Sequence, residues 1–235
     1  MENASKALIM AGSVLMAILV IGLLVFGYQS LSALEQSKEN AKGDLKAEQY
    51  MERFEQFDRT LYGSELLSLA NLLEDYNSII AFENEGYTEM RIKVYTTGIK
   101  GEDEDAKKYF SKGEHSITKI LEDKNDIEEE IAKYEVKNSN YNNKSVKYYS
   151  EKSNRQIAEE FGIDVPGTTP DYDIAEKYLE INTKTNQLLK DIQNYKSLTT
   201  IYNEFRIGKK FECTKIEYDD NNGRITYMYF KEKTK

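Results

Sequence analysis

Two residues of this chain, His115 and Cys213, have side chains that could support nucleophilic catalysis. Such chemistry needs a nucleophile, a base and an orienting group side by side, and the chain holds one His and one Cys. Cys213 lies in an alternating run between Glu212 and Thr214, which predicts a small buried strand residue. His115 lies at the start of a predicted helix, where a solvated imidazole is favoured. We therefore expect a protein that is not an enzyme and carries no cofactor.

Two acidic segments could be read as calcium sites, and the sequence favours a simpler interpretation of each. If Gly223 took the glycine position of an EF-hand loop, Tyr218 and Tyr229 would occupy the positions of its first and last carboxylates. Residues 219–223 are therefore predicted to form a hairpin turn. Residues 102–105 lack the spacing that directs oxygens to one point and are predicted to be a solvated loop. One His and one Cys also cannot supply a zinc site, so no metal is expected.

The charge distribution argues against nucleic acid as a partner. The formal net charge is -9, and 31% of the residues are charged, with both signs interspersed. A nucleic-acid interface needs clustered basic residues.

An uncharged apolar run near the amino terminus predicts a membrane anchor. Residues 8–27 would cover the roughly 30 Å hydrocarbon core of a bilayer as a helix. A cleaved signal peptide, with residues 30–32 as its exit, is a weaker alternative because its apolar core needs only about 7–15 residues. A buried core helix would carry some polar residues. The sequence thus predicts a single-pass protein of the cell membrane, with the lipid bilayer as its first partner.

The orientation of the anchor is predicted from the residues at its two ends. Lys6 stands on the amino side, and Lys38, Lys42 and Lys46 follow well beyond the span among acidic residues. The count of basic residues taken alone points the other way. The polar segment before the span is short, however, and we interpret it as a segment that stays in the cytoplasm. We therefore expect a cytoplasmic amino terminus and an extracytoplasmic carboxyl-terminal domain.

Small residues in the first half of the anchor suggest a packing surface. They recur at a four-residue spacing, which lets helix backbones approach closely in lipid. One interpretation is that such residues are common in membrane helices, and the other is self-association of the anchor. The candidate packing residues are Ala7, Ala11, Ser13 and Ala17.

The remaining patterns predict an α+β fold. Residues 31–58 and 64–80 have helical periodicity, and residues 90–98 alternate as a half-buried strand. Two further alternating runs around the 219–223 turn predict a carboxyl-terminal hairpin, which gives a small antiparallel sheet of at least three strands. The expected domains are a membrane anchor (1–28), helices with the first strand (29–100), a helical insertion (101–205) and the hairpin (206–235).

The insertion is predicted to be a helical hairpin resembling a coiled coil. Helices are expected at about 104–112, 114–137, 153–162 and 171–205. Apolar residues in the last helix alternate spacings of four and three, as do those from Ile117 to Tyr134. A seam within one chain is favoured over a seam between chains. The predicted seam residues are Ile174, Tyr178, Ile181, Leu188, Ile192 and Tyr195.

Three segments carry a resemblance to a known group of proteins. They are MENASKALIMAGSVLMAILVIGLLVF, FEQFDRTLYGSELLSLANLLEDYN leading into RIKVYTTG, and YNEFRIGKKFECTKIEYDDNNGRI. Together they resemble membrane-anchored proteins of clostridial-type Gram-positive bacteria whose layout is similar to that of type IV pilins. The resemblance implies a long amino-terminal helix, a small sheet and a structural role at the cell surface.

Two functions of different class follow. The first is a pilin-like structural or interaction component of a surface or secretion apparatus. The second is a membrane-tethered ligand-binding or sensor module that uses the inserted helices. Either function requires a protein partner or ligand that the sequence does not identify.

Overall fold

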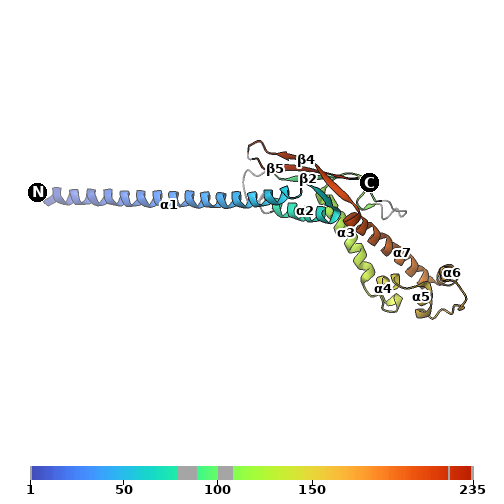
Figure 1. Ribbon diagram of the computed structural model, residues 1–235. Helices are drawn as coiled ribbons and strands as arrows, with labels where there is room; N and C mark the ends of the chain where they lie inside the picture. Colours follow the sequence, from blue (N-terminus) through green and yellow to red (C-terminus); the bar gives the residue numbers. More distant parts are fainter. Residues whose placement is uncertain (1, 79–88, 100–107, 222, 234–235) are drawn as a thin grey trace.

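The computed structural model describes residues 2–78, 89–99, 108–221 and 223–233. It shows a long helical rod, a mixed α+β head at its end, and a helical arm that leaves the head obliquely (Figure 1). The rod is the single helix α1 (Glu2–Glu55). The predicted α+β class, with an apolar amino-terminal helix and a small sheet, is confirmed. The acidic loop predicted at 102–105 and the first part of the helix predicted at 104–112 lie outside the described residues. Residues 108–112 are described and form turns instead of the predicted helix.

The head is built on a five-stranded sheet. Its strands are β1 (Thr60–Tyr62), β2 (Arg91–Thr96), β3 (Gly113–Ser116), β4 (Lys210–Tyr218) and β5 (Ile225–Glu232), in the order β1-β4-β5-β2-β3. The predicted hairpin is β4 and β5, which pair antiparallel. The expectation of a purely antiparallel sheet is wrong, because β5 pairs parallel with β2. The reason is that β4 pairs with the edge strand β1, so the second strand of the hairpin lies beside β2.

The core lies on one face of this sheet. Alternate residues of the strands, including Ile92, Val94, Met228 and Phe230, are buried there. Helix α2 (Gly63–Tyr76) packs its apolar face against them, as its predicted periodicity requires. In Figure 1, α2 and the start of α3 lie on the same side of the sheet.

The start of α2 is fixed by a close backbone approach and a small polar cluster. A Cβ on Gly63 would stand 2.0 Å from the carbonyl oxygen of Phe205, so only glycine fits this crossing. Glu65 accepts hydrogen bonds from the Tyr62 backbone N–H at 2.8 Å and from the Arg59 guanidinium at 2.7 Å. These bonds, that of Arg59 foremost, hold the pKa of Glu65 below its usual value. A negative charge is thus kept at the positive end of the helix.

The last turns of α1 are part of the head. Ala47 and Phe54 are fully buried, and the rings of Tyr50 and Phe54 each meet the ring of Tyr76 with centroids 5.6 Å apart. The Met51 sulfur accepts a hydrogen bond from the backbone N–H of Ile225 at 3.3 Å. The rod therefore enters the hydrophobic core instead of ending at a linker.

The insertion between β2 and β4 forms the arm. After β3 come α3 (Ile117–Glu135), η3 (Ser139–Tyr141), α4 (Val146–Ser150), α5 (Asn154–Glu160), α6 (Asp171–Ile174), η4 (Ala175–Leu179), α7 (Thr183–Asn203) and η5 (Glu204–Gly208). Helices α3 and α7 run side by side as the shaft of the arm, and the short helices form its tip (Figure 1). A helical insertion was predicted, and two of the differences in its details are described next.

The first difference is at the base of the arm. The helix predicted from residue 114 begins at Ile117, because residues 113–116 form β3 and pair with β2. Ser116 then caps the helix by accepting a hydrogen bond from the Lys119 N–H at 3.2 Å.

The second difference is near the tip of the arm. The single helix predicted over 171–205 is broken between η4 and α7. Asn182 adopts an extended backbone there, and its side chain accepts a hydrogen bond from the Lys184 N–H at 3.0 Å. An Asn in this position starts a new helix instead of continuing the old one.

A buried ion pair closes the head where the arm returns to the sheet. The Lys209 ammonium donates to Glu232 at 2.6 Å and to the carbonyl of Gly98 at 2.8 Å. Glu232 also accepts from the backbone N–H and the hydroxyl of Thr97, both at 2.7 Å. The side chains of Lys209 and Glu232 are only 14% and 5% exposed. The network joins the ends of β2 and β5 to the start of β4.

Removing the cation of this network is expected to destabilise the head strongly. Lys209→Met leaves a buried carboxylate without its ion pair, which costs about 3–5 kcal/mol of unfolding free energy. Urea unfolding of the full chain in detergent, followed by near-ultraviolet circular dichroism, measures the loss.

The matched control is Lys93→Met. Lys93 pairs with Glu114 at 2.8 Å, but these side chains are 44% and 58% exposed, so its loss should cost no more than about 1 kcal/mol. Equal effects of the two substitutions would contradict this account of the buried pair.

Candidate functional site

The most prominent surface of the chain is the bare apolar part of α1. Residues 18–35 have a mean hydropathy of 1.7, and none of this segment is buried. Leu24 and Phe26 are each 68% exposed. An exposed apolar surface of this size marks contact with a membrane or a partner. In the described part of the chain this is the one helix that could cross a membrane by length and composition, and a signal sequence would have the same character.

The length of α1 exceeds what a membrane requires. Its 54 residues extend over about 80 Å at about 1.5 Å per residue, whereas the hydrocarbon core of a bilayer is about 30 Å thick. The helix is long enough to cross that core and continue without interruption into the head. The side chains of the predicted packing residues Ala7, Ala11, Ser13 and Ala17 lie outside what the structure describes.

The arm provides the second candidate surface. Its predicted seam residues differ in burial. Ile174, Leu188, Ile192 and Tyr195 are buried, and Tyr178 packs partly buried against them; these five contribute to one hydrophobic cluster at the tip and along the shaft. Ile181 is 78% exposed and does not belong to the cluster. The helix break at Asn182 removes Ile181 from the regular pattern.

Tyrosine-carboxylate hydrogen bonds reinforce the shaft, and sequence reasoning missed them. Tyr141 donates to Asp191 at 2.6 Å, and Tyr202 of α7 donates to Glu128 of α3. Burial and, second, the bond to Glu128 raise the pKa of Tyr202 to about 12, so its phenol stays a donor at neutral pH. Because the partners are 50 and 74 residues apart, short-range periodicity does not reveal them. These bonds have a structural role.

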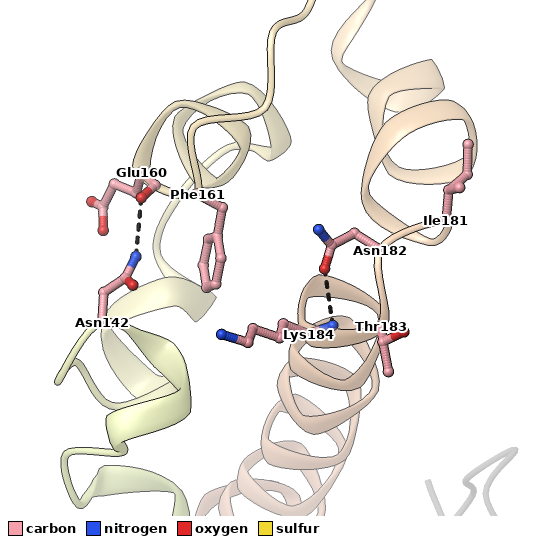
Figure 2. A pocket seen from close by; sticks show the side chains of 7 residues that line it. All are labelled: Asn142, Glu160, Phe161, Ile181, Asn182, Thr183 and Lys184. Carbon is pink, nitrogen blue, oxygen red and sulfur yellow. Dashed lines mark hydrogen bonds between the residues drawn. The ribbon is translucent and has the colours of Figure 1, made fainter.

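The tip of the arm carries an open polar cleft of about 580 Å³ (Figure 2). Asn142 and Phe161 line one side, and Ile181 and the start of α7 line the other. The Asn142 side chain donates to the carbonyl of Glu160 at 3.0 Å, and the Lys184 side chain extends across the cleft. The Glu160 carboxylate already accepts from Tyr148 at 2.6 Å. The cleft therefore offers one cation and several hydrogen-bonding groups, without a nucleophile and base placed together.

The two residues considered for catalysis lie apart in the head. His115 is on β3, where its Nε2 lies 2.9 Å from the carbonyl oxygen of Ser111, so the expected position at a helix start is wrong. Its side chain is partly exposed. Cys213 lies on β4, as its strand pattern predicted, but it is partly buried instead of buried. Among the described residues, no group of three potential metal ligands is found.

Comparisons with family models, curated proteins and solved structures give no match for this chain. Its function is therefore argued from the surfaces of the chain itself.

The thiol of Cys213 is expected to react slowly in the folded protein. Burial, followed by the nearby Asp58 carboxylate, raises its pKa to about 11, and the thiolate is the reactive form. At pH 8.5 the folded chain should carry roughly a hundredfold less thiolate than an unfolded chain whose thiol has the usual pKa of about 8.5. Iodoacetamide labelling measures the rate, which should keep rising as the pH increases towards 11.

The same chain in guanidinium is the control, because Cys213 is its only thiol. Labelling at pH 8.5 that is equally fast in the folded and unfolded states would refute the raised pKa.

A charged substitution in the hydrophobic cluster of the arm should show which of the predicted seam residues are buried. Leu188→Asp places an unpaired carboxylate at a fully buried position and should cost about 2–4 kcal/mol. Ile181→Asp, a control at another predicted seam position, should be nearly neutral because Ile181 is 78% exposed. Urea unfolding measures both. Comparable losses would show that Ile181 is buried in the folded protein.

Proposed function

We propose that this protein is a non-enzymatic, membrane-anchored, pilin-like structural or interaction component of a surface or secretion apparatus. Its amino terminus is cytoplasmic, and its head and arm are extracytoplasmic. The observation that carries the proposal is the continuity of α1, which is bare and apolar over residues 18–35 and buried in the head at Ala47 and Phe54.

The docking of α1 supports a structural role over a simple tether. A flexible linker would suffice to hold an enzyme or receptor near a membrane, because short mobile linkers already give high local concentrations. In this chain the Tyr50 and Phe54 rings pack on Tyr76, so the head cannot rotate freely about the end of the rod. A fixed geometry between membrane and head is useful where subunits must be positioned relative to one another.

The pilin-like part of the proposal is supported by layout and by the resemblance of three sequence segments. A long apolar amino-terminal helix continues into the core below a small sheet, and the carboxyl-terminal hairpin completes that sheet. Anchor residues with small side chains at four-residue spacing, Ala7 to Ala17, would let copies associate in the lipid.

A membrane-tethered ligand-binding or sensor module is the second candidate. The observation in its favour is the open cleft of about 580 Å³ at the tip of the arm. The tip of the arm lies far from α1 in Figure 1, where a ligand would be accessible. Binding of one partner by a monomer would favour this function over assembly.

The proposed orientation predicts the outcome of a protease experiment. Trypsin added to protoplasts of a Gram-positive host that expresses the full chain should remove the head and arm and leave a small membrane-bound fragment. Basic residues such as Lys152 and Lys184 in the arm provide cleavage sites. Full protection of the head in intact protoplasts, with cleavage only after lysis, would exclude the extracytoplasmic orientation. A mature chain that begins near residue 33 would exclude the anchor.

The structural role predicts that association depends on the anchor. The full chain in membranes should form cross-linked oligomers with an amine-reactive reagent. The same chain shortened to residues 36–235 is the control and should be monomeric by light scattering. A full-length chain that remains monomeric in membranes would favour the second candidate.

A further inference from the structure

The face of the sheet opposite the core is open and carries an unusual set of side chains. In the described part of the chain, the helices lie on the other face (Figure 1). The alternation of β2 and β5 places tyrosines and basic residues on the open face, in paired register across the two strands. Its members on these strands are Arg91, Lys93, Tyr95, Tyr227, Tyr229 and Lys231.

A groove of about 550 Å³ lies on this face. Tyr95 and Tyr229 contribute aromatic walls, Lys112 and Lys231 contribute cations, and Thr214 contributes a hydroxyl. Its volume lies within the range of about 300–1,000 Å³ that is usual for small-molecule sites. The groove is separate from the arm-tip cleft and from α1.

The cations of the groove differ in how they are neutralised. Lys93 pairs with Glu114 at 2.8 Å. Lys231 lies 6.0 Å above the centre of the Tyr95 ring, and neither Lys231 nor Lys112 forms an ion pair with another described residue. Although the net charge of the chain is -9, the groove thus exposes two cations that have no carboxylate partner among the residues that the structure describes. An anionic group is the complementary ligand.

The aromatic residues add apolar contact area beside these cations. The rings of Tyr227 and Tyr229 lie nearly parallel, with centroids 5.9 Å apart and planes inclined by 17°. Tyrosine gives a large contact area at a low cost in conformational entropy, and its hydroxyl can hydrogen-bond to a ligand. Such a surface suits the face of a ring-shaped ligand that has apolar C–H groups and polar edges.

We propose that this groove binds an acidic oligosaccharide. A sugar acid carries a carboxylate for Lys112 and Lys231, ring faces for the tyrosines, and hydroxyls that both donate and accept hydrogen bonds. An acceptor for those hydroxyls is present, because Glu114 lines the groove.

The same acceptor disfavours a nucleic acid at this site. Aromatic residues and lysines in a groove also bind single-stranded nucleic acid. A phosphate backbone offers acceptors and negative charge only, so it has no hydrogen-bond donor for Glu114. The presence of a carboxylate beside the lysines favours a ligand that carries hydroxyl donors as well as carboxylates.

Isothermal titration of the full chain in detergent tests the assignment. The ligands are an oligogalacturonate of uniform length, the uncharged galactose oligomer of the same length, and a single-stranded DNA oligonucleotide. The oligogalacturonate should bind most tightly. Lys112→Gln combined with Lys231→Gln should weaken its binding at least tenfold and reduce the dependence of binding on salt. Tyr229→Leu should also weaken it.

The controls are matched substitutions at exposed positions on the arm. Lys133→Gln and Tyr172→Leu should leave the affinity unchanged, and circular dichroism should show that every variant is folded. No binding of oligogalacturonate, equal binding by the chain with both lysines replaced, or tighter binding of the DNA would each overturn the proposal. Equally tight binding of the uncharged oligomer would overturn the role assigned to the lysines.

Discussion

The contact between the end of α1 and the head determines how every other surface is presented. Phe54 is fully buried and meets Tyr76 edge to face, so the rod, α2 and the sheet share one core. Without this contact, burial of the apolar segment at residues 18–35 in an apolar environment would still be favourable, but the orientation of the head relative to α1 would not be fixed. Because the helix ends in the core, the open sheet face and the arm have fixed directions relative to its axis.

Two connections to the head hold the arm in this fixed direction. It leaves after β2 through the edge strand β3, and it returns through η5 to β4. At the return, Phe205 stacks on Phe110 with ring centroids 3.9 Å apart, and the Lys209–Glu232 pair ties β4 to the ends of β2 and β5. Both connections thus join strands of the sheet, so the arm leaves from one strand of the sheet and returns to another.

The parts of the fold that local patterns control were predictable from the sequence. The β4–β5 hairpin follows from its alternation and turn, and α2 follows from its helical face. The parallel pairing of β5 with β2 was not predictable, since either hairpin strand has an apolar face that fits beside β2. Ile181 kept the four-three spacing while Asn182 started a new helix, so the predicted seam included one exposed residue. The sheet groove was also missed, because its tyrosines and lysines come together only when β2, β3, β4 and β5 are assembled.

Because α1 is uninterrupted, a tilt of this helix displaces the head at its end. Membrane-spanning helices tilt by about 20° on average, and the part of α1 between the predicted span (8–27) and its end at Glu55 would be roughly 40 Å long at about 1.5 Å per residue. A tilt of that size would carry the head sideways by roughly 10–15 Å. In a bilayer, the local thickness and the packing of neighbouring helices would therefore set how far and in which direction the head is displaced. A change in either would also move the tip of the arm.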